Sequence, residues 1–144
     1  MTYRYVPSFG LRIIQFTLLL EGVVRGLMYL TMPDQPGAPL TELEQSAPLA
    51  TWGVIFITFS VVGLFGEALM SGTEEHLNSG VNPRAWPSFV AHAGLMILYV
   101  TLTLAASATI IDRGMGYYAV VPYDLLMLAY LHWLFARRRK SHVR

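Results

Sequence analysis

The residues of this sequence that could do chemistry lie in stretches that are otherwise apolar. The clearest case is Thr17–Leu30, which reads TLLLEGVVRGLMYL and carries Glu21 and Arg25 among leucines, valines and glycines. On a helix these two side chains share one face, because residues four positions apart are neighbours on its surface. A carboxylate and a guanidinium placed in this way can form an ion pair, and either group can take part in an ion or proton route.

The stretches around these charges have the length and composition of membrane spans. Hydrophobic residues make up 54% of the 144 residues and charged residues 13%, whereas soluble domains average about 25% charged residues. The apolar residues fall into four blocks, at residues 11–32, 49–70, 89–111 and 117–135. Each block approaches the roughly 20 residues that a helix needs to cross about 30 Å of hydrocarbon. We therefore expect an all-α integral membrane protein, with one transmembrane domain over residues 1–144 that forms an antiparallel four-helix bundle.

Basic residues flank these blocks unevenly. Arg4 lies before the first block and Arg84 between the second and third, whereas the segment between the first and second blocks has acidic residues and no basic one. A basic cluster follows the fourth block and consists of Arg137, Arg138, Arg139 and Lys140. Because Lys and Arg are retained on the cytoplasmic side, we expect a multi-pass protein of the inner (plasma) membrane with both termini in the cytoplasm. We interpret the cluster as a membrane-surface anchor and expect no nucleic-acid partner.

Small residues recur on one face of the first two blocks. They are Gly22 and Gly26 in the first block, and Gly53, Ser60 and Gly63 in the second. Small side chains let helix backbones approach closely in a membrane, and Gly22 and Gly26 have the spacing of a known pairing motif. We assign these residues to helix packing. The pattern leaves open whether the two glycines join two spans of one chain or two copies of the chain.

Three more ionisable residues lie inside the blocks, namely Glu67, His92 and Asp124. Counted at about 1.5 Å per residue from the centre of each span, Asp124 comes to about the depth of Arg25 in the outer half. By the same count, Glu67 and His92 come to a common depth in the cytoplasmic half. We therefore predict two polar layers, with Asp124 beside the Glu21–Arg25 pair in one and Glu67 beside His92 in the other.

These five ionisable groups allow two interpretations. They can form a satisfied polar core that fixes which helices pair and in which register, or they can line an ion or proton route. The groups show no repeated or symmetric pattern along the sequence. We therefore favour the polar core and keep the route as the alternative.

The sequence has no pattern typical of an enzyme or a metal site. Cysteine is absent, so a thiol nucleophile and a cysteine-based metal site are excluded. Glu74, Glu75 and His76 are adjacent, a spacing that does not place ligands on one helix face. H-E-x-x-H, G-x-S-x-G and Walker-type motifs are also absent. We expect no catalytic residue, cofactor or metal, and an enzyme acting on lipid is the least favoured function.

The layout resembles that of the small four-span membrane proteins encoded by actinobacteriophages. It shares with them its size, an acidic loop that leads into APLATWG at residues 47–53, and a short arginine-rich tail. The resemblance implies a non-enzymatic phage or bacterial envelope effector, acting in superinfection exclusion, immunity or lysis control, and it carries over no functional residue. The alternatives are a small oligomeric ion or proton channel and a holin-like pore former. Besides the lipid bilayer, a second copy of the chain or a membrane-protein partner stays open.

Overall fold

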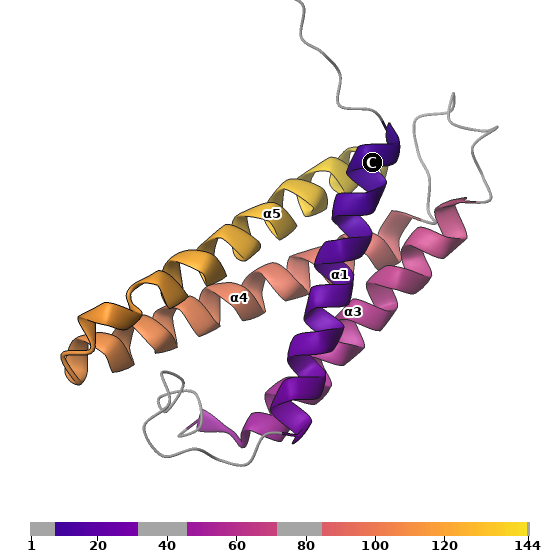
Figure 1. The fold of residues 1–144 in the computed structure, drawn as a ribbon. Coiled ribbons are helices and arrows are strands. Elements are labelled where there is room, and N and C mark those ends of the chain that lie inside the picture. The colour runs from indigo at the N-terminus through magenta and orange to yellow at the C-terminus, as the bar shows by residue number, and fades with distance from the viewer. Residues whose placement is uncertain (1–7, 32–45, 72–84, 144) are drawn as a thin grey trace, which may run out of the picture.

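The computed structural model describes residues 8–31, 46–71 and 85–143 of the chain. The described residues form helices and no strand, and the elements are α1 (Ser8–Thr31), α3 (Leu49–Ser71), α4 (Trp86–Asp112), the short 3₁₀ helix η3 (Gly116–Tyr118) and α5 (Val120–Val143) (Figure 1). Four stretches are long and apolar enough to cross a membrane, at Phe9–Thr31, Leu49–Met70, Trp86–Asp112 and Gly116–Arg138. The coarse expectation of an all-helical, multi-pass membrane protein is thereby confirmed.

Three helices extend by more than one residue beyond the apolar blocks that predicted them, and the first, α1, begins at Ser8 rather than at residue 11. α4 begins at Trp86 rather than at residue 89, with Pro87 in its first turn, where a missing N–H breaks no helical hydrogen bond. α5 continues to Val143, although its apolar block ends at residue 135. Hydropathy marks where lipid contact ends, and a helix can continue past that point into basic sequence.

A glycine fixes the turn that ends α4. Gly114 has a φ of 64°, a left-handed conformation that glycine adopts without strain. Its N–H donates to the carbonyl of Ile111 at 3.3 Å, and the N–H of Met115 donates to the carbonyl of Ile110 at 3.0 Å. These two bonds form a Schellman motif, which satisfies the last carbonyls of the helix. After η3, α5 lies beside α4 (Figure 1).

The helices pack in chain order, with α1 against α3, α3 against α4 and α4 against α5. Figure 1 shows two pairs, α1 with α3 and α4 with α5, whose axes cross. Contact between α1 and α5 is slight. The backbone of α1 therefore packs mainly on α3, and Gln15 and Glu21 of α1 reach α4 through side-chain hydrogen bonds.

The backbones of α1 and α3 touch at a pair of glycines. A Cβ added to Gly26 would lie 2.6 Å from the carbonyl oxygen of Gly53, and a Cβ added to Gly53 would lie 2.6 Å from that of Gly26. One turn away Gly22 lies against Ser60, and Gly63 meets Leu19 in the same way. All the small residues assigned to packing thus lie at contacts within one chain, and α3 covers the face formed by Gly22 and Gly26.

Apolar side chains cover the outside of the helices and polar ones lie within. Among the described residues, the buried polar or charged side chains are Gln15, Ser60, Glu67, Ser88, His92, Thr109 and His132. Exposed apolar side chains on α1 alone include Phe9, Ile13, Leu20, Val24 and Leu27. A protein surface of this kind suits contact with lipid, where polar groups must find their partners inside the protein.

Replacing Gly26 by Ala is expected to destabilise the protein by about 1–3 kcal/mol, because the new methyl group meets backbone that cannot move without separating α1 from α3. The matched control is Gly116→Ala, since a Cβ at Gly116 meets nothing within 4 Å. Thermal unfolding in detergent, followed by circular dichroism, measures both variants. Equal midpoints for the two variants would contradict the close α1–α3 contact.

Candidate functional site

Gln15 of α1 lies at the centre of a buried polar cluster near one end of the helices. Its Nε2 atom is 2.5 Å from Glu67 Oε1 on α3 and 3.1 Å from His92 Nε2 on α4. Ser88 Oγ donates to the same Glu67 oxygen at 2.5 Å and lies 3.4 Å from Gln15 Nε2. Glu67 and His92 therefore share one cluster, as their depths predicted, and an amide links them.

A second histidine joins this cluster from α5. His92 Nδ1 and His132 Nδ1 are 2.8 Å apart, and both side chains are fully buried. Phe135 stacks on the ring of His92 with centroids 5.3 Å apart, and Tyr99 stacks on the ring of His132 with centroids 5.4 Å apart. Aromatic rings thus hold both imidazoles in place. Among the described residues, no group of three or more His, Cys, Asp or Glu side chains could hold a metal ion.

The prediction from sequence missed His132, although a signal for it was present. Leu125, Ala129, His132 and Ala136 are buried on α5 and recur every three or four residues, which is the spacing of one helix face. A histidine on the apolar face that packs against α4 was a candidate partner for His92.

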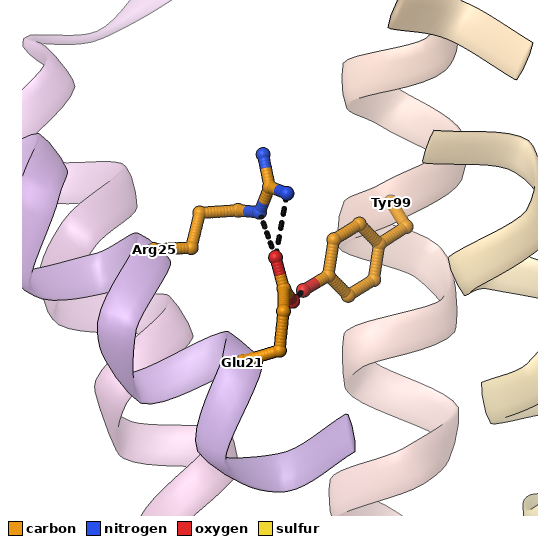
Figure 2. Close-up of polar contacts among 3 residues, drawn as sticks. All are labelled: Glu21, Arg25 and Tyr99. Carbon is orange, nitrogen blue, oxygen red and sulfur yellow. Dashed lines mark hydrogen bonds and ion pairs between the residues drawn. The ribbon is translucent and has the colours of Figure 1, made fainter. Parts of the chain in front are cut away.

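The ion pair of α1 forms a second polar cluster. Arg25 donates to Glu21 Oε1 from Nε at 2.8 Å and from Nη2 at 2.5 Å. Tyr99 of α4 donates its hydroxyl to Glu21 Oε2, and the guanidinium lies over the ring of Tyr99 at 5.4 Å (Figure 2). The side chains of Arg25 and Glu21 remain 26% and 30% exposed, so their neighbours only partly enclose the pair.

The prediction that Asp124 joins this pair is wrong. Asp124 is exposed on α5, next to Leu125, whose side chain is buried against the other helices. A depth count gives the height of a residue along the bundle but not the direction of its side chain around the helix. Because α5 packs on α4 and its contact with α1 is slight, the exposed carboxylate of Asp124 does not reach Arg25. The hydroxyl of Tyr99 takes the place that we expected for Asp124.

The two clusters meet where Tyr99 lies against His132. The planes of the two rings differ by 14°, and Tyr99 contributes its ring to the histidine pair and its hydroxyl to Glu21. His132 Nε2 has no hydrogen-bond partner among the residues that the structure describes. A ring stack rather than a hydrogen bond therefore joins the clusters. Both clusters contain side chains from α1 and α4. In the cluster around Gln15, α3 also contributes Glu67 and α5 contributes His132.

Only part of the basic cluster that we interpret as a surface anchor is described. Arg137 and Arg138 are exposed, and the guanidinium of Arg137 lies over the ring of Trp133 at 5.4 Å. The side chains of Arg139 and Lys140 lie outside the described residues, as do Glu74, Glu75 and His76. Contact of this cluster with a membrane surface stays a prediction.

No family model, curated protein or solved structure matches this chain. The functional interpretation therefore depends on the contacts within the chain itself.

Replacing Arg25 by Leu is expected to destabilise the protein more than the double change Glu21→Leu with Arg25→Leu. The single change leaves a carboxylate in apolar surroundings without its cation, whereas the double change removes both charges. Loss of one partner from a buried pair costs about 3–5 kcal/mol, and partial exposure places this pair at the low end. Thermal unfolding of the purified variants in detergent measures the difference. Equal destabilisation would show that the two charges do not depend on each other.

Proposed function

We propose that this chain is a non-enzymatic multi-pass protein of a bacterial inner membrane that acts as an envelope effector. In this role it excludes competing phages, confers immunity or controls the timing of lysis. Its fold in the membrane is an antiparallel four-helix bundle with both termini in the cytoplasm.

The observation that carries this proposal is the contrast between an apolar surface and a polar interior within one copy of the chain. Gln15, Glu67 and His92 bind one another inside the molecule, while the exposed faces of its helices are rich in Ile, Leu, Val and Phe. A pore former that opens large lesions needs helix faces that can exchange lipid for water. A chain that keeps its polar groups inside suits a compact effector better than a holin-like pore.

The contacts between α1 and α3 support the antiparallel arrangement. Leu19, at the middle of α1, lies against Gly63 in the second half of α3, whereas Gly26, further along α1, lies against Gly53 near the start of α3. The sequence supports the orientation, because the basic cluster lies at the C-terminal end of α5 and the segment between α1 and α3 carries no Lys or Arg.

The second candidate function is a small ion or proton route. It is favoured by the polar contacts that run from Glu67 through Gln15 to the histidine pair. These contacts form inside one copy of the chain, so this candidate does not depend on an oligomer.

Fusion of reporters to the C-terminus tests the orientation. With the C-terminus in the cytoplasm, a fused green fluorescent protein is expected to fluoresce and a fused alkaline phosphatase to stay inactive. The matched control is a truncation after residue 115, which removes α5 and moves the fusion point to the outer side, so that both readouts reverse. Active phosphatase on the full chain would contradict the proposed orientation.

Expression in an actinobacterial host tests the effector role. Cells that make the protein are expected to yield fewer plaques from some challenge phages, or to lyse at a changed time after infection, while uninfected cells keep their optical density. The control is an unrelated four-span protein expressed to the same level. A membrane-potential dye is recorded together with the optical density.

Two results would overturn the effector proposal. Abrupt loss of both potential and optical density in uninfected cells would indicate a holin-like pore instead. Unchanged plaque numbers and lysis times for every phage tested would show that the chain has no effector role in that host.

A further inference from the structure

Among the described residues, the exposed charged side chains at one end of the helices are all basic. The cluster around Gln15 shows which helix termini share this end, because it joins the first half of α1 and of α4 to the last turns of α3 and the second half of α5. On the terminal side of this cluster, Arg12 of α1 and Arg137 and Arg138 of α5 are exposed. The carboxylate of Glu67 is buried. The described part of this end therefore carries an excess of positive charge on its surface.

The opposite end of the helices has a different balance of charge. Asp112 and Arg113 are exposed where α4 ends, and Asp124 is exposed near the start of α5. Acidic side chains thus accompany the arginine at this end. In membrane proteins the basic end lies on the cytoplasmic side, where anionic lipids give the leaflet a negative surface potential. The basic end of this chain matches that leaflet in charge.

One arginine of the basic end is held by aromatic rings on α5. The guanidinium of Arg137 lies over the ring of Trp133 at 5.4 Å, and Tyr130 stacks on Trp133 with centroids 5.7 Å apart. All three side chains are exposed. Because they are three and four positions apart, they lie on one face of the helix. We call this row of one cation and two rings the Arg137 ladder.

The guanidinium of Arg137 has N–H donors that no described residue uses. Its contact among the described residues is the ring of Trp133 rather than a carboxylate. A guanidinium presents five N–H donors in a planar fork, which matches the oxygens of a phosphate. The ring of Trp133 restricts the directions that this side chain can take, so it loses less conformational freedom when it binds a ligand. A positioned cation with unused donors is suited to a phosphate group.

The Arg137 ladder also spans the depth of the headgroup region of a membrane. Arg137 is the last residue but one of the apolar stretch Gly116–Arg138. Counted along the helix, Trp133 lies about 6 Å deeper and Tyr130 about 10 Å deeper than Arg137. Tryptophan and tyrosine favour the boundary between headgroups and hydrocarbon. A lipid phosphate at Arg137 would therefore place its glycerol and upper acyl chains beside the two rings.

We propose that the Arg137 ladder binds an anionic phospholipid of the cytoplasmic leaflet. The phosphate binds the guanidinium of Arg137, and the acyl chains lie along Trp133 and Tyr130. The occupant is a lipid because the rings are exposed within a membrane-spanning stretch. It is anionic because the basic end attracts a headgroup of net negative charge more strongly than a zwitterionic one. This inference depends on the proposed function only in taking the helices to span a membrane with the C-terminus in the cytoplasm.

The test measures quenching of Trp133 fluorescence by brominated lipids around the reconstituted full chain. Trp52→Phe with Trp86→Phe leaves Trp133 as the one tryptophan, and we call this variant the parent. Vesicles of phosphatidylcholine contain either brominated phosphatidylglycerol or the same fraction of brominated phosphatidylcholine. The two quenching curves give the relative affinity of the lipids at Trp133. We expect phosphatidylglycerol to be favoured about fivefold, the size expected for one arginine at an anionic surface.

Two substitutions in the parent separate a site from a general effect of charge. Arg137→Gln is expected to lower the preference about fivefold, to nearly equal affinities, because it removes the cation that binds the phosphate. Arg113→Gln is the matched control, since Arg113 is exposed at the opposite end, and its preference should equal that of the parent. High salt should also reduce the preference of the parent, because the screening length falls to about 3 Å at 1 M salt.

Three results would overturn the inference. They are equal quenching of the parent by the two brominated lipids, a full preference in Arg137→Gln, and an equal loss of preference in Arg113→Gln and Arg137→Gln. The last result would assign the preference to the net charge of the chain. Circular dichroism checks the fold of each variant. If the parent does not fold, native mass spectrometry decides instead, by comparing the phosphatidylglycerol retained by the wild type, Arg137→Gln and Arg113→Gln.

Failure of this inference can be told apart from failure of the proposed function. Equal quenching by both lipids leaves α5 in the membrane and removes only the lipid preference. A Trp133 that neither brominated lipid quenches would overturn the inference together with the membrane-spanning arrangement of α5. Plaque numbers and lysis times test the effector role separately.

Discussion

A polar group in hydrocarbon has no water to bind, and this constraint accounts for the organisation of the whole molecule. Each unsatisfied group costs several kcal/mol at membrane depth, so the polar side chains of four separate helices must find each other. Gln15 from α1, Glu67 from α3 and His92 from α4 do so at a single point. Their bonds specify which helices are neighbours and at what height, whereas apolar side chains, which contact lipid as well as they contact each other, specify this poorly.

Close backbone contact is what brings these groups within reach. At Gly26 and Gly53 any side chain would separate α1 from α3, and Gln15 and Glu67 form a hydrogen bond only if the two helices lie close together. Gly66 likewise allows α3 and α4 to approach closely, because a Cβ at this position would lie 2.6 Å from the backbone nitrogen of Ser88. Ser88 is the residue that donates to Glu67. The glycines and the polar network are therefore two aspects of one packing arrangement.

The sequence could predict features that depend on one helix alone, but not those that depend on how several helices are placed. The four spans, the Glu21–Arg25 pair and the small faces depend on spacing along a single helix, which a sequence displays directly. The polar core depends also on how each helix is rotated about its axis, which hydropathy alone leaves undetermined. For this reason the depth count placed Glu67 with His92, where the structure also has them, but assigned Asp124 to a cluster that it does not reach. The role of Gln15 as a link between Glu67 and His92 required the positions of three helices.

Tyr99 and His132 were missed for a related reason. The part that a tyrosine hydroxyl or a histidine ring plays depends on its neighbours on other helices. In the structure Tyr99 contacts two clusters, with its ring on His132 and its hydroxyl on Glu21. Tyr99 thus lies between two parts of the interior. One part contains the amide, hydroxyl and imidazole groups around Glu67. The other part is the ion pair of Arg25 with Glu21.

This division bears on what the interior can do. The ion pair of Arg25 with Glu21 holds its two charges in place through hydrogen bonds. Two neutral imidazoles in contact share one hydrogen bond between their Nδ1 atoms, in which one ring donates and the other accepts. The interior therefore combines an ion pair whose two groups satisfy each other with a buried His132 Nε2 atom that has no hydrogen-bond partner among the described residues.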